Sequence, residues 1–409
     1  MHIAFVCREY LPTLRGGGIA SYIHEMAINL IRRGHSVTVI CASDDTRVFS
    51  DLKEDGIRVI RLSGGDFILP QIEKSSLWKK LRCLYRFFSY RKKILRQIEQ
   101  LEGVDIIEVA EYGAEAYYLS KCHVPVVIRL HTPTLLDRSN FSIKRFNIRT
   151  FYDYCIGKKE LSILSQFKYI TSCSASLKDW FLRYVPNMTG NIEVIYNPIE
   201  VAKWETGEID YIDNSILYVG TVMEEKGIGD LVEACRMLRE QNIPVTLKIV
   251  GKWGTYAMKL QSYVADNHFD WCSFEGNLPR EELHNLYSKA KISCFPSWWE
   301  NMPLVCLEAM LAGNIVIGSR NGGMIEIITD KKDGFLVEPH APKDLAECIY
   351  KALMMNKNSV TDMKKNALHK IQETFSIEAV MQSMENYYVD VIKDYKNVFT
   401  TDYYSIFYR

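Results

Sequence analysis

The feature that most constrains the fold is a regular alternation of short apolar runs and amphipathic segments in both halves of the chain. The first half opens with the apolar run 3–7, a loop that contains glycines, and residues 19–33 with apolar positions at helical spacing. After a stop at Gly34, residues 37–41 form another apolar run. This order of strand, helix and strand predicts an α/β fold with a parallel sheet covered on both faces.

The alternation continues to the end of the chain with one interruption. Because 409 residues exceed one ordinary core, we expect two doubly wound domains of about 200 residues each. Residues 200–214 are acidic and poorly periodic, as an interdomain linker would be, and Ser376 can cap a last helix over 377 to about 394. The expected domains are 1–198, 199–375 and a C-terminal helix and tail, 376–409. Further strands are predicted at 58–62, 105–109, 124–130, 169–172, 215–219, 245–250, 271–274, 291–295, 314–317 and 334–337.

Composition excludes several classes of protein. Lys plus Arg and Asp plus Glu both number 50, so no overall field favours nucleic acid. The 11 cysteines are odd in number and lack a Cys-x-x-Cys pair, which argues against disulfides and a structural zinc site and favours a reducing cytosol. No uncharged run reaches the roughly 18 residues of a spanning helix. We therefore expect a cytoplasmic protein, soluble or peripheral on the membrane.

Two carboxylates, Glu300 and Glu308, lie eight positions apart around a predicted helix start. Glu300 follows the predicted strand 291–295, Pro303 suits the first helical position, and Gly313 ends the helix. Helix N-termini at the carboxyl ends of strands are where open α/β sheets bind ligands. Paired acids there indicate acid–base chemistry first, and they also suit the hydroxyl groups of a ribose and a sugar.

A second candidate is the loop 220–227, which lies between a predicted buried strand and a helix. Its amides and Lys226 would project from the carboxyl edge of the sheet, where they can receive a diphosphate without a metal. Taken alone, a surface lysine in an ordinary loop is the better interpretation. No Walker A loop is present, which argues against ATP hydrolysis of that type.

Two candidates in the first half also follow predicted strands. Arg15, Gly16, Gly17 and Gly18 precede a helix, and backbone without Cβ atoms there can approach a phosphate or sugar, although a tight turn explains them equally. His131 ends the strand 124–130 at a carboxyl edge, but a lone histidine is more often structural.

Together these residues resemble the retaining GT-B glycosyltransferases of family 4, which transfer a sugar from a nucleotide diphosphate donor to an acceptor. The resemblance extends along nearly the whole chain, and it rests on the order and spacing of motifs that are individually weak. The motifs are Gly17-Gly18, 34–39, Asn197-Pro198, Val219-Gly220, Lys226-Gly227, 300–313, 322–326 and 333–337. The resemblance implies two Rossmann-like domains facing a cleft, with a C-terminal helix that returns to the first domain.

The resemblance also implies roles for individual residues. Lys226 would bind the diphosphate, Glu308 the ribose hydroxyls and Glu300 the donor sugar. His131 would approach that sugar from the first domain, and Gly17 and Gly18 would close over phosphate or acceptor. Residues 274–278 would hold the base and 321–324 would lie beside the sugar. The catalytic residues would be Lys226, Glu300 and His131, and the other donor contacts Gly220, Thr221, Gly276, Asn277, Leu278, Asn301, Met302 and Leu304, with no metal and no cofactor.

Three departures from the family pattern affect these roles. Thr221 stands where relatives often carry Arg, so one cation of a diphosphate clamp is missing and Lys226 would carry more of the charge. Lys252 stands where an acid is frequent and would compensate, although a solvated surface lysine is the simpler interpretation. Pro303 replaces a frequent Gly and removes one N–H from the sugar-facing loop.

The segment 74–98 has nine Lys or Arg, no acid, and interleaved aromatic residues such as Trp78 and Tyr85. This composition favours an anionic bilayer interface and hence a lipid-linked acceptor. The alternative, that the aromatics pack on the first domain, is nearly as good.

The sequence therefore predicts a metal-independent retaining hexosyltransferase that serves a glycan or lipid-linked acceptor, in surface polysaccharide or glycolipid synthesis. Two alternatives stay open. One is a nucleotide-sugar epimerase of similar fold, and the other is a noncatalytic subunit that binds a nucleotide sugar. UDP, GDP and ADP donors are all compatible with the motifs.

Overall fold

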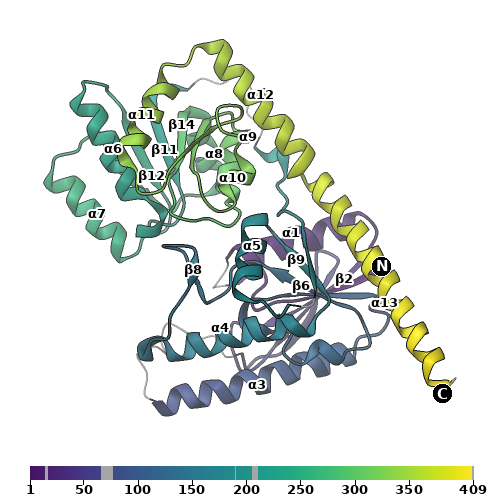
Figure 1. The fold of residues 1–409 in the computed structure, drawn as a ribbon. Helices are drawn as coiled ribbons and strands as arrows, with labels where there is room; N and C mark the ends of the chain where they lie inside the picture. The colour runs from purple at the N-terminus through teal and green to yellow at the C-terminus, as the bar shows by residue number, and fades with distance from the viewer. Residues whose placement is uncertain (14–16, 66–76, 189, 205–210, 408–409) are drawn as a thin grey trace. The chain divides into compact units, whose positions relative to one another are not determined.

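The computed structural model describes all residues except 14–16, 66–76, 189, 205–210 and 408–409 (Figure 1). The chain forms two compact units. Unit 1 contains Met1–Leu136, Ile143–Pro198 and Val380–Arg409, and unit 2 contains Asp137–Ser142 and Ile199–Ala379. The chain thus enters unit 2 after Pro198 and returns to unit 1 within its last helix.

Unit 1 is built on an eight-stranded sheet in the order β10-β9-β6-β5-β1-β2-β4-β3. All of its strand pairs are parallel except β3 with β4. Every residue of the central strands β5 and β6 is buried, as expected where helices cover both faces. The strands are β1 (His2–Val6), β2 (Ser36–Ala42), β3 (Ser50–Glu54), β4 (Ile57–Leu62), β5 (Ile106–Ala110), β6 (Val126–Leu130), β9 (Tyr169–Ser172) and β10 (Asn191–Val194).

The helices of unit 1 cover this sheet, and α3 and α4 lie side by side in Figure 1. Lys159 of α4 reaches to 5.9 Å from the ring of Phe88 on α3, which confirms their contact. The long helix α13 is tied to the sheet by Tyr388, whose hydroxyl donates to Glu108 at 2.6 Å. The helices are α1 (Gly18–Arg32), α3 (Leu77–Glu99), α4 (Phe151–Ile163), α5 (Ala175–Tyr184) and α13 (Ile377–Phe407), with the 3-10 helices η1 (Tyr112–Ala114), η2 (Leu119–Lys121), η3 (Ile148–Thr150) and η4 (Leu164–Gln166).

Unit 2 has a six-stranded, fully parallel sheet in the order β13-β12-β11-β14-β15-β16. Its strands are β11 (Ile212–Val219), β12 (Thr246–Val250), β13 (Cys272–Gly276), β14 (Ala290–Phe295), β15 (Ile315–Ser319) and β16 (Phe335–Val337). Its helices are η5 (Val201–Lys203), η6 (Glu224–Lys226), α6 (Ile228–Glu240), α7 (Thr255–Asp266), α8 (Arg280–Lys289), α9 (Leu304–Leu311), α10 (Met324–Ile327), α11 (Pro342–Leu353) and α12 (Lys357–Thr374).

A small hairpin of β7 (Leu136–Asp137) and β8 (Ser142–Ile143) precedes α4, and its tip is grouped with unit 2. The tip residue Phe141 stacks on Trp299 of unit 2, with ring centroids 5.3 Å apart. The core cluster of unit 2 takes residues in register from one face of its sheet, such as Ile249 of β12 and Cys294 of β14, and packs them against α6, α7 and α11.

The predicted α/β class and the predicted strands are confirmed, with ends shifted by a few residues. The prediction of a parallel first sheet is wrong at its edge, because β3 returns antiparallel to β4 through Asp55 and Gly56, both with positive φ. The strand β3 reads Ser-Asp-Leu-Lys-Glu and is largely exposed, so it carries no buried apolar run. The linker prediction overlaps the start of β11, whose first residues are also exposed.

Two helix boundaries also differ from the predictions. Pro303 is the N-cap of α9 rather than its first helical residue, with ψ near 103°. The last helix extends to Phe407, well beyond the predicted end. Its predicted cap is confirmed, since the Ser376 hydroxyl accepts from the Ala379 N–H at 3.2 Å.

Candidate functional site

The carboxyl edge of the unit 2 sheet is formed by loops that approach each other very closely. Gly227 has φ of 67°, and a Cβ there would lie 2.0 Å from the Pro296 carbonyl oxygen. The Trp298 N–H also donates to the Glu225 carbonyl at 2.9 Å. The loops that follow β11 and β14 are therefore locked together, and only glycine fits at position 227.

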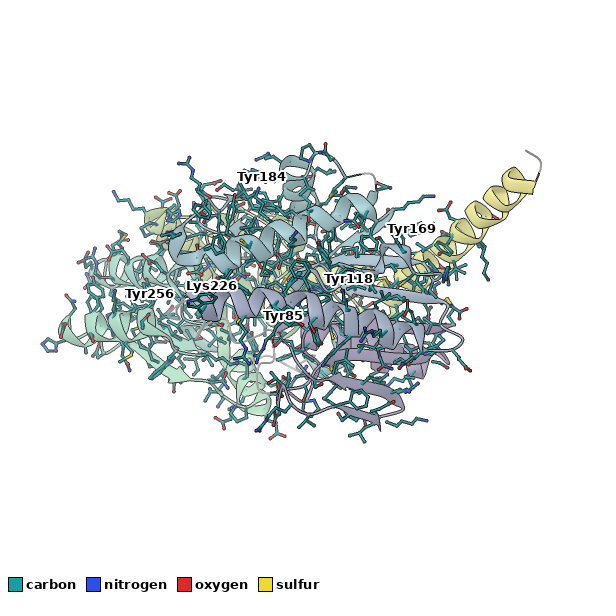
Figure 2. The ribbon with its side chains drawn as sticks, turned by 90° about the horizontal axis from the view of Figure 1, so that it is seen from below. Tyr85, Tyr118, Tyr169, Tyr184, Lys226 and Tyr256 are labelled. Carbon is teal, nitrogen blue, oxygen red and sulfur yellow. The ribbon has the colours of Figure 1, made fainter. Side chains whose placement is uncertain are left out.

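This contact brings together the two charged residues that the sequence pattern indicated separately. Lys226 Nζ forms an ion pair with Glu300 Oε1, and the Ser297 hydroxyl donates to the same oxygen at 3.3 Å. Their side chains are 16% and 20% exposed, so a ligand can reach both. Lys226 is marked in Figure 2. The site thus presents a cation and an acid as one positioned pair.

A third loop holds the backbone beside Glu300. The Gly323 N–H donates to the Glu300 carbonyl at 2.8 Å, and a Cβ on Gly323 would lie 1.6 Å from the Asn301 carbonyl oxygen. Asn321 Nδ2 donates to the Trp298 carbonyl at 2.8 Å. Residues 321–323 therefore fix the segment that carries Glu300, while the predicted contact residues Met302 and Leu304 are buried and half-buried at the start of α9.

Glu308 lies on α9, where it is half-buried. Burial raises the pKa of its carboxyl to about 7, and the nearby Arg280 and the Tyr287 hydroxyl limit this rise. Neither Arg280 nor Tyr287 was predicted as a site residue. Arg280 is the first residue of α8, directly after Pro279. It lies two positions beyond the predicted base-holding segment 274–278, and this proximity could have indicated it as a site residue.

The other predicted donor contacts lie on neighbouring loops of the same edge. The Gly251 N–H donates to the Gly276 carbonyl at 2.7 Å, and a Cβ on Gly251 would lie 1.8 Å from the Gly220 carbonyl oxygen. The loops after β11, β12 and β13 are therefore in mutual contact. Exposed or half-exposed side chains on them include Thr221, Lys252, Asn277 and Leu278.

In unit 1, His131 follows β6 and is buried. Its backbone N–H donates to Glu111 Oε2 at 2.8 Å. Its imidazole ring contacts the ring of Tyr22, with centroids 5.1 Å apart. Burial, and then the neighbouring Arg129, hold the pKa of His131 well below its usual value. The imidazole is therefore neutral near pH 7, and it can act as a hydrogen-bonding group but not as a cation.

The predicted glycine loop of unit 1 is described in part. Arg15 and Gly16 lie outside the described residues, Gly17 is the N-cap of α1, and Gly18 is its first residue. A Cβ on Gly18 would meet no described atom within 4 Å, so the space beside this residue is open.

The basic segment of α3 has two different halves. Trp78, Leu81 and Tyr85 are 82%, 47% and 75% exposed and share one helix face, on which Figure 2 labels Tyr85. Phe87 and Tyr90, by contrast, are buried in unit 1. Packing on the domain is therefore the correct interpretation for the second half of the segment only.

None of the described helices has the length and apolar character needed to span a membrane. Among the same residues, no group of three or more His, Cys, Asp or Glu is arranged to hold a metal ion.

Two family models match consecutive parts of the chain. Residues 16–203 match the model Glycosyltransferase Family 4, and residues 206–370 match Glycosyl transferases group 1. Together the two models cover most of the chain, which belongs to the glycosyltransferases that they describe. This glycosyltransferase is 25% identical over 377 residues to the glycogen synthase of Mycobacterium tuberculosis, a match that covers 86% of each chain. It is 29% identical over 168 residues to the amylovoran biosynthesis glycosyltransferase AmsK of Erwinia amylovora, across 39% of this chain and 41% of that one.

Solved structures show the same fold. Sucrose-phosphate synthase from Thermosynechococcus elongatus superposes with a TM-score of 0.78 at 21% identity, over 96% of this chain and 99% of that one. Anabaena Alr3699/HepE in complex with UDP-glucose gives 0.66 at 19% identity, over 94% and 98%. This glycosyltransferase therefore has the GT-B fold, with two Rossmann-like domains.

Proposed function

We propose that this glycosyltransferase is a retaining, metal-independent hexosyltransferase that uses a nucleotide diphosphate sugar. Its acceptor would be a glycan or a lipid-linked sugar in surface polysaccharide or glycolipid synthesis. The observation that carries the proposal is the Lys226–Glu300 pair, held by glycine contacts at the carboxyl edge of unit 2. The amylovoran relative and the UDP-glucose complex of the HepE neighbour support the acceptor and donor classes.

In this proposal unit 2 binds the donor. The diphosphate would lie at Lys226, near the N-terminus of α6, where Gly227 provides no side-chain cap and the first amides can face an anion. Glu308 would accept hydrogen bonds from the ribose, and Glu300 would orient the sugar. Gly220, Thr221, Gly276, Asn277, Leu278, Asn301, Met302 and Leu304 would supply the remaining donor contacts.

The energetic demand of the reaction falls on the leaving group. Negative charge grows on the diphosphate while the sugar becomes oxocarbenium-like, so preorganised positive charge lowers the barrier. Lys226 and the helix amides would provide it. A diphosphate oxygen would take the acceptor proton as the new bond forms on the face that the nucleotide leaves. Glu300 and the neutral His131 would then orient reacting groups, and Gly17 and Gly18 would admit phosphate or acceptor.

The exposed face of α3 supports peripheral binding to the cytoplasmic face of a membrane. Trp78, Leu81 and Tyr85 can insert among headgroups, while exposed Arg82 and Lys92 of the same helix attract anionic lipid. Each such cation contributes about 1 kcal/mol near an anionic surface, which suffices for reversible docking. This surface would deliver the enzyme to a lipid-linked acceptor.

Incubation with UDP-glucose, GDP-mannose and ADP-glucose tests the enzymatic part. We expect slow release of free nucleotide from one donor, accelerated by the correct acceptor, with retained anomeric configuration in the product. An isomerised donor would instead indicate an epimerase, and tight binding without any chemistry would indicate a noncatalytic subunit. EDTA should leave the rate unchanged.

Vesicle co-sedimentation tests the membrane part. Wild-type protein should pellet at low salt with phosphatidylglycerol vesicles but not with phosphatidylcholine vesicles. The double variant Trp78→Ala/Tyr85→Ala should lose pelleting, while the control Tyr350→Ala, which removes a partly exposed ring from unit 2, should keep it. Equal pelleting by all three proteins would remove the proposed surface.

A further inference from the structure

Two fully buried carboxylates lie under the carboxyl edge of unit 1, and the proposed chemistry does not use either. Glu111 follows β5 and has no exposed surface. Its Oε2 accepts the N–H of His131 at 2.8 Å, and its own N–H donates to the Arg129 carbonyl at 3.0 Å. Glu111 thus joins the end of β5 to the residue that follows β6.

Glu160 of α4, also without exposed surface, makes the second connection. Its Oε1 accepts the N–H of Gly113 at 2.7 Å, and the N–H and hydroxyl of Thr134 donate to its two oxygens at 2.8 and 2.7 Å. One carboxylate therefore ties the turn after β5 and the loop after β6 to the same helix.

The packing around these carboxylates leaves little freedom. A Cβ on Gly157 of α4 would lie 2.5 Å from Leu135 Cγ, so α4 is pressed against the loop that begins at His131. On the other side, Arg91 of α3 donates to the Gly113 carbonyl at 2.5 Å and pairs with the buried Glu115 at 3.4 Å.

We propose that Glu111 is a positioning residue for His131, and that Glu111 and Glu160 form a carboxylate bridge that fixes the acceptor-side edge of unit 1 for sugar transfer. This inference rests on the proposed role of His131. Neither carboxylate touches the donor or the acceptor. Glu111 sets the position of the His131 backbone, and Glu160 sets the turn and loop on either side of it.

The bridge also gives this edge a dependence on pH. Burial, and then the charge of Glu160, raise the pKa of Glu111 to about 8, so Glu111 carries a proton at neutral pH. Above pH 8 two carboxylates face each other in a buried site, and the bridge weakens. The titratable and charged groups around it include Arg8, Glu9, Arg91, Tyr112, Glu115, Arg129, His131, Asp153 and Glu160.

The raised pKa of Glu111 also makes its contribution to folding stability depend on pH. The folded-state pKa of Glu111 lies above its unfolded value, so its contribution to stability is complete below about pH 4.5 and is lost as pH rises through about 8. Glu111→Gln keeps an oxygen that accepts the His131 N–H but cannot ionise. Glu111→Ala removes the acceptor as well.

The test measures nucleotide release from the active donor as a function of pH, together with backbone amide exchange. In Glu111→Gln we expect turnover within about twofold of wild type at pH 7, and loss of the alkaline decline near pH 8. In Glu111→Ala we expect turnover about tenfold lower with donor KM within twofold, because one buried hydrogen bond is lost. Exchange at the His131 amide should accelerate in the Ala variant only.

Glu115→Gln is the matched control, because it alters another buried carboxylate of the same turn, one that pairs with Arg91. It should lower the melting temperature without changing the shape of the pH profile. An unchanged alkaline decline in Glu111→Gln, or unchanged His131 exchange in Glu111→Ala, would overturn the inference.

The amide exchange separates this inference from the proposed function. If no donor releases nucleotide with wild-type protein, the proposed function fails, and exchange at His131 still reports whether Glu111 holds its backbone. If wild type is active and Glu111→Ala matches it in turnover and exchange, the carboxylate bridge fails alone.

Discussion

The carboxyl edges of the two sheets differ in where they place their charge. Unit 2 leaves Lys226 and Glu300 partly exposed on loops that are locked by glycine contacts. Unit 1 buries Glu111 and Glu160 completely and uses them as acceptors for backbone N–H groups. The same type of sheet edge therefore serves two purposes. Charged side chains that a ligand can reach are available for binding in unit 2, whereas buried carboxylates hold the loops in place in unit 1.

This difference accords with the division of labour proposed for the two units. A donor diphosphate needs reachable positive charge, and Lys226, which would supply much of it, lies on a loop whose position is fixed by glycine contacts. Unit 1 presents a buried, neutral His131, which suits hydrogen bonding to hydroxyl groups. Three predictions test the contrast.

The largest effect is expected at Lys226. Lys226→Ala should lower turnover at saturating donor about 10²–10³-fold, the loss typical for one preorganised group that stabilises developing negative charge. The melting temperature should change little, because the ion pair with Glu300 is partly exposed. Wild-type turnover in this variant would remove Lys226 from the chemistry. Lys351→Ala, which removes an exposed lysine of unit 2 that pairs with Glu347, is the control for a general charge effect.

The second prediction compares one glycine from each unit. Gly323→Ala would place a methyl group 1.6 Å from the Asn301 carbonyl, so it should destabilise unit 2 by about 3 kcal/mol or more. Gly18→Ala meets open space at the start of α1 and should stay within about 0.5 kcal/mol of wild type. Urea unfolding of both variants measures the difference, and equal losses would show that loop contact does not distinguish the two edges.

The smallest effect is expected at Glu308. With its pKa near 7, the carboxylate is the better acceptor for ribose hydroxyls above pH 7, so donor KM should rise about threefold between pH 8 and pH 6. Glu308→Gln should abolish this dependence, and Glu308→Ala should raise donor KM about tenfold at pH 8. A KM that is independent of both substitutions would exclude a ribose contact.

The sequence predicted the elements of the fold better than their edges. Buried strands such as β1 and β15 contain continuous apolar runs, over residues 3–6 and 315–317, which is why they were predictable. The edge strand β3 is polar and exposed, and its pairing depends on the turn at Asp55 and Gly56 rather than on apolar burial. Local pattern does not specify such a strand.

The candidate site shows the same limit. The positions of Lys226, Glu300 and Glu308 after predicted strands placed all three at the carboxyl edge of the second sheet. The structure adds that Lys226 and Glu300 form a direct ion pair. Glu111 and Glu160 were not predicted, although Glu111 follows a buried strand just as His131 does. Their role depends on hydrogen bonds between residues 20 or more positions apart, which no local pattern contains.

The most direct test of the contrast between the two edges is backbone hydrogen exchange with and without the nucleoside diphosphate of the active donor. The account predicts slower exchange in residues 220–228 and 301–308 of unit 2, and unchanged exchange at 111–115 of unit 1. Protection at 111–115 without protection at 220–228 would contradict it, because the diphosphate would then bind at the edge whose charge is buried.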